Sequence, residues 1–404
     1  MEDISIHFSE ELEQWKKGLE SDPRNPLNTN QLVWNLPSGI RIAPVYDAAS
    51  LPESLHYLQE FHQEWKLQKK AKKPALIVSS ASAMACTPEE TSIAEKLGFS
   101  SWAGLGPSGH KLPAENSLSN DAITESLCMG EKTPGFRKLE QGHLTDNPAI
   151  NSVFFHRSGA NEAEDLAYCL CLAAHHREFL NEIDFQEFLK KVTLHLAAGT
   201  SFFLEMARLR ALRLLWMNFT AQCGAGRLAG NIRAESSLLY WSKSDTDGNL
   251  LRHTSAAMSA IMGGADALLV HPHTFDPVSA ADAIRLSVGI GHLALEEARL
   301  KNSFDPGSGS YLIEMLTHEL VRKAWSLFCS WQNLSLEEKL QSGFFPEMAG
   351  QGAARLKNLF AKGELTLTGV NRHPSPMAKS GPACPVWQPA GTEFPALKPI
   401  LLDA

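Results

Sequence analysis

Short apolar runs alternate with longer segments of helical periodicity through the middle of the chain. Runs of four to eight apolar residues are typical of strands that are covered on both faces, and such runs occur at 73–80, 149–156, 230–240 and 264–271. Apolar residues three and four positions apart predict helices at 161–176, 202–219, 280–300 and 316–328. Strands that alternate with helices predict an α/β fold with a parallel sheet.

The two ends of the chain have a different pattern. Residues 1–45 predict an arm, with a helix near 9–19, a coil rich in Pro and Asn, and an extended segment interrupted by Pro37 and Gly39. Prolines are so frequent in 372–404 that regular structure is not expected there. We therefore divide the chain into an arm (1–45), an α/β domain (46–371) and an extended tail (372–404).

Composition narrows the class of protein. The chain has 404 residues, is 44% apolar and carries a net charge of −8, which argues against a nucleic-acid or membrane-surface protein. Its start lacks the pattern of a signal peptide, and no apolar run approaches the length of a membrane span. Seven cysteines without a Cys-x-x-Cys pair are typical of reduced thiols, so we expect a cytoplasmic protein.

Histidines are the first candidates for chemistry. His271 and His273 follow the run at 264–271, and the carboxyl ends of barrel strands form the catalytic face of such folds. No carboxylate or cysteine lies nearby at a ligand spacing, so we favour a hydrogen-bonded histidine over a zinc site and predict no metal. His175 and His176 are expected to be surface or capping residues near a helix end.

Other polar clusters favour structural roles. Arg208, Arg210 and Arg213 lie on the segment 202–219, which predicts a strongly amphipathic helix, and ion pairing is the preferred interpretation. The glycine-rich turn at 304–310 lacks the Gly-Lys-Ser/Thr of a phosphate loop. Instead, Thr317 is expected to cap the following helix, with Glu319 in its first turn. A hydrolase is disfavoured because the chain has no Gly-x-Ser-x-Gly elbow.

Four stretches resemble the methylmalonyl-CoA mutase family. They are FDPGSGSYLIEMLTHELVRKAW (304–325), SFFLEMARLRALRLLW (201–216), EQW together with LVWNLPSGIRIAPVY in the arm, and GELTLTGVN (363–371). The resemblance covers most of the chain from Ser9 to Asn371. It implies a (β/α)8 TIM-type barrel, either complete or shortened, since 46–151 is shorter than in active chains. It also implies adenosylcobalamin-dependent radical isomerisation of an acyl-CoA bound along the barrel axis.

The resemblance also reveals departures from the active pattern. The family's Tyr-His-x-Gln-Glu-Ala-Gly-Ala becomes VFFHRSGA (153–160), so Phe154 stands at the catalytic histidine position and His156 at a glutamine position. The family's Arg-Thr-His-Ser-Gln-Thr-Ser-Gly-Trp becomes RAESSLLYW (233–241), which puts Glu235 at a histidine position and Ser237 at a glutamine position. Phenylalanine cannot assist at a thioester carbonyl, and the bulky residues 238–240 are expected to fill the channel.

Some family positions are retained. Arg233, Trp241 and His271 match family residues and are the candidate ligand-binding residues that the resemblance implies. The Asp-x-His-x-x-Gly signature of the cobalamin-binding domain does not occur in the chain. We therefore expect no cobalamin-binding domain and no cofactor bound by this chain, with adenosylcobalamin held by a partner.

These observations lead to two hypotheses. In the first, the chain is the small, structural and non-catalytic subunit of a two-chain methylmalonyl-CoA mutase, paired with a large catalytic subunit. Trp15, Trp34 and Trp387 are then the candidate interface anchors, because buried aromatic side chains dominate interface energies. In the second, the chain is itself the active acyl-CoA-binding barrel and uses a separate cobalamin-binding chain.

Overall fold

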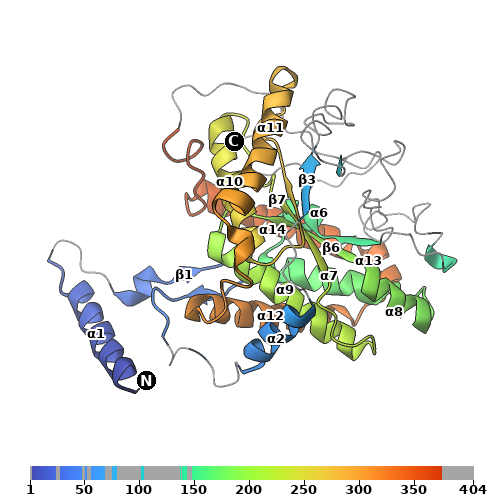
Figure 1. Cartoon of the computed structure of the whole chain (residues 1–404), viewed down its shortest axis with the longest axis horizontal. Coiled ribbons are helices and arrows are strands. Elements are labelled where there is room, and N and C mark those ends of the chain that lie inside the picture. Colours follow the sequence, from blue (N-terminus) through green and yellow to red (C-terminus); the bar gives the residue numbers. More distant parts are fainter. Residues whose placement is uncertain are drawn as a thin grey trace.

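The computed structural model describes residues 2–23, 28–47, 51, 56–68, 75–79, 102–103, 137, 139–142 and 148–374. These residues form a mixed α/β body with an N-terminal helix that stands apart from it (Figure 1). The expected tail lies almost wholly outside the described residues.

A parallel sheet forms the centre of the body. Its strands are β3 (Ala75–Ser79), β4 (Trp102–Ala103), β5 (Ala149–Asn151), β6 (Thr193–Ala198), β7 (Asn231–Ser236) and β8 (Ala267–Val270). Their order is β4-β3-β8-β7-β6-β5, and every pair is parallel. The last strand in the chain, β8, pairs with the first strand of the sheet, β3. That pairing closes a barrel in other (β/α) folds, so the sheet fits the expected shortened barrel.

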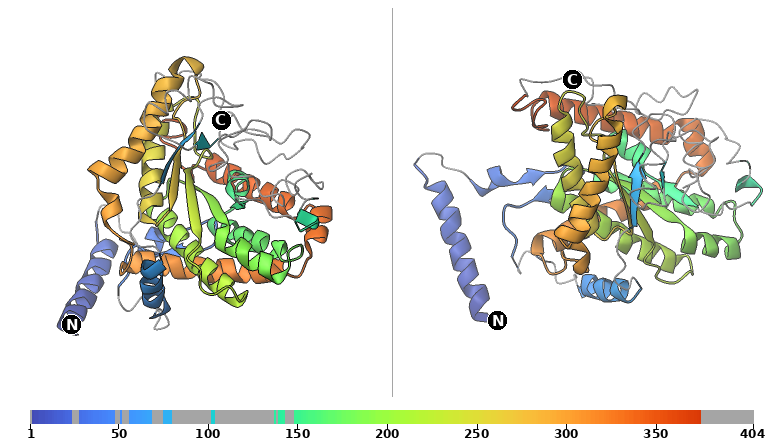
Figure 2. Two further views of the ribbon diagram at one scale, coloured as in Figure 1. Left: turned by 45° about the vertical axis from the view of Figure 1, so that its right-hand side comes forward. Right: turned by 45° about the horizontal axis from the view of Figure 1, so that its top comes forward.

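Helices cover the outside of the sheet (Figures 1 and 2). They are α7 (Glu162–His176), α8 (Glu182–Lys191), α9 (Phe202–Gln222), α10 (Thr246–Met262), α11 (Ala280–His292) and α12 (Tyr311–Trp331). Short helical segments extend α11 and precede α12: η4 (Pro277–Ser279), η5 (Leu293–Glu297) and η6 (Leu300–Asn302). The apolar core lies between the helices and the strands, where Leu194, Ile232 and Leu268 pack with residues of α7, α9 and α12.

Three further helices complete the body. The short α6 (Val153–Arg157) follows β5 directly, while α13 (Leu336–Ser342) and α14 (Phe344–Ala361) follow α12. Helix α14 contacts the turn after α6 closely, because a Cβ placed on Gly352 would lie 2.4 Å from the carbonyl oxygen of Gly159. Glycine is required on both sides of this contact.

The N-terminal residues are divided between the body and the space beside it. Helix α1 (Glu2–Glu20) lies away from the body in every ribbon view (Figures 1 and 2). After η1 (Thr29–Leu32), the strands β1 (Trp34–Asn35) and β2 (Arg41–Ile42) form a hairpin whose Leu36 and Ile40 are buried in the core. Helix α2 (His56–Gln68) packs against α9, and the guanidinium group of Arg213 lies over the ring of Trp65.

Helix α9 is more deeply buried than its sequence suggested. It was expected to be amphipathic, but all residues from Leu204 to Met217 are buried, including its arginines. The prediction of an exposed polar face was wrong because carboxylates and carbonyl oxygens from other elements surround each guanidinium. The expected ion pairing itself is confirmed.

Two further local expectations were wrong, and of the two roles expected for His175 and His176 the surface position was wrong. The strand expected at 149–156 ends at Asn151, since the Asn151 side chain accepts a hydrogen bond from the amide of Val153 and α6 begins there. Helix α12 begins at Tyr311, so Thr317 does not cap it and instead donates to the carbonyl oxygen of Ile313. His175 and His176 are buried, and His176 bonds the carbonyl oxygen of Leu172.

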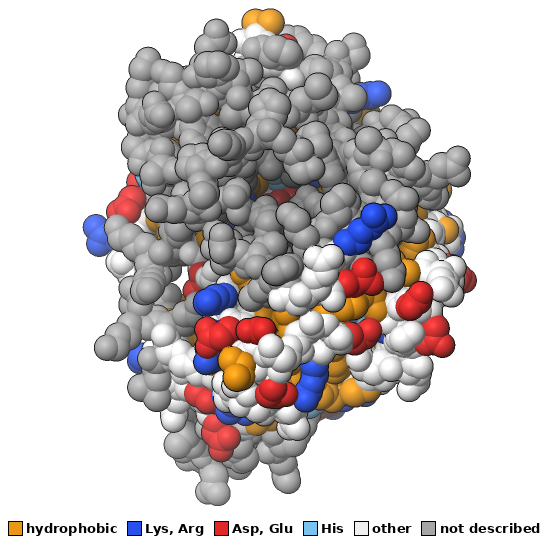
Figure 3. All heavy atoms as spheres, turned by 90° about the vertical axis from the view of Figure 1, so that its right-hand side faces the viewer, with side chains coloured by type: hydrophobic (Ala, Val, Ile, Leu, Met, Phe, Trp, Pro, Cys, Tyr) orange, Lys and Arg blue, Asp and Glu red, His pale blue; other side chains and the backbone are white. Residues whose placement is uncertain are grey.

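The described surface mixes charges of both signs. On the face shown in Figure 3, acidic and basic side chains are interspersed among apolar ones wherever the residues are described. This mixture agrees with the acidic composition of the chain. Among the described helices, none is long and apolar enough to cross a bilayer.

Candidate functional site

The inner face of the sheet carries an unusual row of polar side chains. Alternate residues of a strand point to opposite faces, and Leu194, Leu196 and Ala234 join the core under the helices. The intervening positions therefore point inward. His195 of β6 and Arg233 of β7 are paired neighbours there, and Glu235 follows two residues later on the same side.

Glu235 is the centre of a buried network. Its Oε1 lies 2.9 Å from Nη2 of Arg157 and 3.1 Å from Nε2 of His271, and its Oε2 lies 3.0 Å from Nε2 of His195. Arg157 comes from α6, and His271 follows β8, so four elements contribute to the network. All four side chains are buried. Both carboxylate oxygens are thereby engaged by groups of the same chain.

The charges in this network follow from its burial. Burial acts to raise the pKa of Glu235, but the contacts with His271, Arg157 and His195 outweigh it and hold the pKa well below its ordinary value. Burial lowers the pKa of both His195 and His271. His271 therefore bonds the carboxylate as a neutral N–H donor, His195 lies against it without a hydrogen bond of good geometry, and Arg157 supplies the positive charge.

Two other substituted positions contact each other. Nε2 of His156 lies 2.9 Å from Oγ of Ser237, and both side chains are buried. Burial, with further contributions from Arg208 and Arg157, lowers the pKa of His156 to about 3, so this imidazole is neutral. The side chains at the two positions where the family pattern has glutamines are thus hydrogen-bonded to each other inside the barrel.

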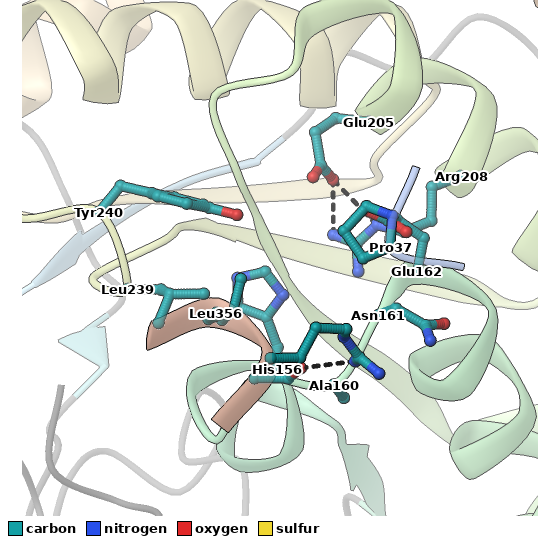
Figure 4. Close-up of a pocket in the computed structure, with 12 residues that line it drawn as sticks. Pro37, His156, Ala160, Asn161, Glu162, Glu205, Arg208, Leu239, Tyr240 and Leu356 are labelled. Atoms are coloured by element: carbon teal, nitrogen blue, oxygen red, sulfur yellow. Dashed lines mark hydrogen bonds and ion pairs between the residues drawn. The ribbon is translucent and has the colours of Figure 1, made fainter. Parts of the chain in front are cut away.

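A small pocket lies beside this network at the carboxyl ends of β5, β6 and β7 (Figure 4). Leu239 and Tyr240 approach it from one side and Glu205 and Arg208 from the other. Pro37 of the arm hairpin and Leu356 of α14 also line it. The pocket offers about 30 Å³ to the centres of water molecules, which is room for about two waters and not for a thioester substrate.

The charged side chains of the pocket are mostly paired. Arg208 forms ion pairs with Asp165 and with Glu205, the latter at 2.6 Å. Burial raises the pKa of Glu162 to about 7, its own backbone opposes the shift and Glu205 adds to it, so this carboxyl is partly protonated near neutral pH. Arg355 of α14 donates to the carbonyl oxygen of Gly159 and bonds Glu164 at 3.1 Å. These contacts fasten α14 across the mouth of the barrel.

The structure brings only some of the candidate residues together. Arg233 and His271 lie around Glu235, whereas Trp241 packs against Phe275 and donates its indole N–H to the carbonyl oxygen of His273. Phe154 is buried on α6. No contact with a ligand tests these assignments, which remain predictions.

The candidate interface residues differ in exposure. Trp15 on α1 is 38% exposed and Trp34 on β1 is 51% exposed, which are high values for tryptophan. Trp387 lies outside the described residues. The two described candidates are available on the surface, and their role as anchors stays a prediction.

Arg157 and His195 were not identified as site residues from the sequence. A signal for Arg157 existed, because the alignment of VFFHRSGA places this arginine at a glutamate position of the family motif, while Glu235 stands at a histidine position. The two changes compensate each other as an ion pair of 2.9 Å. His195 lies in a strand that the sequence did not reveal.

The expectation that the chain binds no metal stays a prediction. Within the residues that the structure describes, no group of three or more His, Cys, Asp or Glu side chains is arranged to hold a metal ion. His271 is fully buried against Glu235, and His273 is two residues farther along the chain with its backbone bonded to Trp241.

Comparisons with known proteins agree with the motifs. The family profile described as methylmalonyl-CoA mutase matches residues 146–388. The "Probable methylmalonyl-CoA mutase small subunit" of Mycobacterium tuberculosis is 33% identical over 63% of this chain and 42% of its own length. The "Methylmalonyl-CoA mutase small subunit" of Streptomyces virginiae is 30% identical over 69% of this chain and 47% of its own. The "Methylmalonyl-CoA mutase large subunit" of Porphyromonas gingivalis is 28% identical over 56% of this chain and 33% of its own. The chain therefore matches less than half the length of these relatives.

Proposed function

Since the chain belongs to the methylmalonyl-CoA mutase family, we propose that it is a small, non-catalytic subunit that stabilises a cobalamin-binding large subunit. The mutase activity, the interconversion of methylmalonyl-CoA and succinyl-CoA, would then reside in the partner. One observation carries this proposal. The residues at the altered motif positions bind each other, Glu235 to Arg157 and His271 and His156 to Ser237, in place of facing an open channel.

The missing donor supports a non-catalytic role. Stabilising charge on a thioester carbonyl needs a hydrogen-bond donor aimed at its oxygen. Phe154 stands where the family pattern has its histidine, and its ring is buried on α6. The nearest histidine in sequence, His156, is already bonded to Ser237.

The closed mouth supports the same conclusion. The loop after β7 fills the entrance with Leu238 and Leu239, both of which are buried. Helix α14 closes the adjoining side, where Gly352 lies directly against Gly159, and Pro37 of the arm covers the remaining pocket (Figure 4). Substrate entry would require several of these contacts to break together.

The described residues do not fit adenosylcobalamin. Its role in this family is to initiate radical chemistry, and a chain that used it would have to present open polar groups at the barrel mouth. His271, which the resemblance places at a cobalamin-facing mouth, is instead 0% exposed and bonded to Glu235. We therefore place the cofactor in the large subunit and assign no step of the reaction to this chain.

The arm supplies the surface for pairing. Helix α1 extends away from the body (Figures 1 and 2), so its face around Trp15 is not covered by the barrel. Trp34 lies on the hairpin that joins this helix to the body, so both tryptophans are placed to be buried by a partner. A cytoplasmic location fits the free thiols of Cys169, Cys171, Cys223 and Cys329.

The test is capture of the partner from native extract with the tagged chain, followed by mass spectrometry. We expect one longer chain that bears Asp-x-His-x-x-Gly, at equal stoichiometry. The variants Trp15→Ala and Trp34→Ala should each weaken pairing at least about tenfold, as buried aromatic anchors do. Leu251→Ala is the matched control, because Leu251 is a 73% exposed apolar residue on α10 and not on the arm. Recovery of the chain alone or as a self-pair would refute the subunit assignment.

One observation favours the alternative, an active acyl-CoA-binding chain that uses cobalamin from a separate chain. Arg233 has a buried guanidinium without a partner among the described residues, as a ligand-binding arginine would. Titration of the isolated chain with coenzyme A esters separates the two functions. Micromolar binding would favour the enzyme, and no binding would favour the structural subunit.

A further inference from the structure

We propose that a buried contact between Lys339 and His175 is a pH-sensitive latch, which holds α13 on α7 at neutral pH and releases it when His175 takes up a proton. The two helices lie side by side (Figure 1). The proposal goes beyond the structural role above and does not rest on it. The arm contributes no residue to the contact, so failure of the latch would leave the subunit assignment untouched.

Lys339 is a lysine without any exposed surface. Its side chain lies on α13 and is 0% exposed. Its Nζ donates to Nε2 of His175 at 2.8 Å and to the carbonyl oxygen of Leu334 at 2.7 Å. Among the described residues, no carboxylate forms an ion pair with this ammonium. Lysines are almost never fully buried unless they are paired, so the contact with His175 carries much of the compensation for its burial.

His175 connects this ammonium to a carboxylate at the surface. A lysine has only donors, so Nε2 of His175 accepts from Lys339 and carries no proton. The proton of the neutral imidazole is therefore assigned to Nδ1, which donates to Oε1 of Glu178 at 2.5 Å. The Glu178 side chain is 43% exposed. The negative charge that faces Lys339 is thus reached through an imidazole that must stay neutral.

The groups around His175 oppose a second proton on its ring. Burial lowers the pKa of His175, the hydrogen bond with Glu178 opposes the shift, and Lys339 and His176 add to it. The thiol of Cys171, on the preceding turn of α7, lies 3.5 Å from Nε2. Burial, opposed by Lys339, raises the pKa of this thiol to about 11, so it stays neutral. Glu178 is therefore the one carboxylate that acts on the ring among the described residues.

Protonation of His175 removes an acceptor and adds a charge. An imidazolium donates at both nitrogens, so Lys339 would lose its hydrogen bond and face a like charge 2.8 Å away. Water screens such a repulsion poorly in a buried site. Only Leu336 and Lys339 are buried among the residues of α13. Loss of the lysine contact therefore leaves one buried side chain to hold the helix, and α13 separates from α7.

The direction of the pH dependence follows from proton linkage. A released His175 binds a proton near pH 6.5, whereas the latched His175 has a lowered pKa and binds one only in more acidic solution. The latch is therefore fully closed above about pH 6.5 and weakens as the pH falls below it. Its opening constant should rise by up to about tenfold per pH unit in that range.

The latch lies at the start of the helix that covers the barrel mouth. Gly343, at a φ of 65°, ends α13 and precedes α14 directly. Helix α14 in turn contacts the turn after α6, where Gly352 lies against Gly159. Release of α13 would thus loosen one end of the helix that closes the mouth.

Three cysteines provide a measurement of release within the chain. Cys171 is fully buried beside the latch and contacts His175 and Gln332, so it should become accessible when α13 separates. Cys169, two residues earlier, is equally buried but lies near Asp165, so it should react only when the whole chain unfolds. Cys329 is exposed and records how the reagent itself responds to pH.

The experiment labels the full chain with dithiodipyridine, which reacts with thiols in acid as well as neutral solution, from about pH 7.5 to about pH 5. Mass spectrometry gives the labelling rate at each cysteine. We expect the ratio of Cys171 to Cys329 to be constant above about pH 6.5 and to rise up to about tenfold per pH unit below it, while Cys169 stays unlabelled. A ratio that stays constant would refute the latch. An equal rise at Cys169 would also refute it, because the whole chain would then be unfolding.

Variants assign the response to the contact. In His175→Gln the amide oxygen can accept from Lys339 but does not titrate, so the labelling ratio should stay constant at every pH. Glu337→Gln, which alters an exposed carboxylate on α13, is the matched control and should behave as the wild type does. A His175→Gln chain with the wild-type pH response would overturn the proposal. If that variant does not fold, Lys339→Met takes its place, because it removes the charge that repels the imidazolium, and an unchanged response in that variant has the same meaning.

Discussion

The arginines of α9 and the arginines inside the barrel are equally buried but differ in what surrounds them. Arg208, Arg210 and Arg213 are each in contact with at least one carboxylate from another element. Inside the barrel, Arg157 shares Glu235 with two histidines, and Arg233 forms no ion pair with any described carboxylate.

The difference separates charges that hold elements together from a charge that joins no described element. Arg210 joins α9 to the turn before α12 through Asp305 and to α12 itself through Glu314, at 2.7 and 3.1 Å. Arg213 donates hydrogen bonds of 2.6 Å to two carbonyl oxygens, and its guanidinium group lies over the ring of Trp65. On the inner row of β7, Arg233 forms no ion pair with another described residue. The guanidinium groups of α9 therefore join elements of the fold, and that of Arg233 does not join any of the described ones.

The largest expected effect is in α9. Arg210→Met should lower the free energy of unfolding by about 3–5 kcal/mol, because Asp305 and Glu314 would stay buried without their counter-charge. Arg233→Met should change it by less than about 1 kcal/mol, since no partner is left behind. Urea denaturation of both variants measures the contrast. Equal losses would show that Arg233 has a structural partner after all.

The next effect concerns the shared carboxylate. Glu235→Gln should cost about 2–3 kcal/mol, because Arg157 would lose its charged acceptor in a buried site. Urea denaturation measures the loss. Glu319→Gln, which alters an exposed pair with Arg322, is the control. A loss no larger than that of the control would argue against the shared-acceptor picture.

A pH series probes the neutral histidines of the same region. Burial, with His271 and His273 adding to it, lowers the pKa of His253 to about 3, against about 6.5 in an unfolded chain. Below pH 6.5 the unfolded state therefore binds a proton that the folded state refuses, and stability falls as the pH falls from 6.5 towards 3. His253 should contribute about 1.4 kcal/mol per pH unit to this fall.

The measurement is the difference in unfolding free energy between wild type and His253→Asn at pH 6.5 and at pH 4.5. Glu162 and Asp165, whose pKa values burial raises to about 7 and about 6, act in the opposite direction between pH 4 and 7. Both proteins contain them, so they cancel in the difference. An identical pH slope in wild type and variant would mean that His253 becomes protonated in the folded chain.

The smallest effect sets the baseline. Arg285→Met removes an exposed pair with Asp282, in which the two side chains are 61% and 78% exposed. Such pairs contribute little, so the change should stay within about 0.5 kcal/mol. Thermal and urea unfolding should both agree with the wild type. A larger loss would mean that methionine substitution itself perturbs the helices, and the contrast between Arg210 and Arg233 would need rescaling.

Much of the fold was predictable because outward-facing strand residues and helix faces are apolar. The runs at 73–80, 230–240 and 264–271 correspond to β3, β7 and β8. Strand β6 was missed because His195 interrupts its apolar run, which is what an inward-facing polar residue does in a barrel. The start of α12 was misplaced because Thr317 has the chemistry of a helix cap but bonds Ile313 within the helix.

The candidate site was predictable only in part. The motifs indicated Phe154, Arg233, Glu235 and His271, because each stands at a position of a recognisable pattern. The partners of Glu235 were not accessible from spacing, since Arg157 and His195 come from elements 78 and 40 residues away along the chain and meet it only through the parallel register of β6 and β7. The sequence also could not show which buried arginines find a hydrogen-bond acceptor, because the acceptors come from other elements of the packed barrel.

The pairing of β3 with β8 has a consequence for how the chain reaches its fold. The strand near the beginning of the domain is held by the last strand of the sheet, and α2 is fastened by contacts such as His62 to Asp305, 243 residues apart, and Tyr57 to His318, 261 residues apart. Contacts of such long sequence separation form slowly. During synthesis the early strand and helix must wait, with their apolar faces uncovered, until residues beyond 300 have left the ribosome. The first eighty residues are therefore the part of the nascent chain most in need of a chaperone.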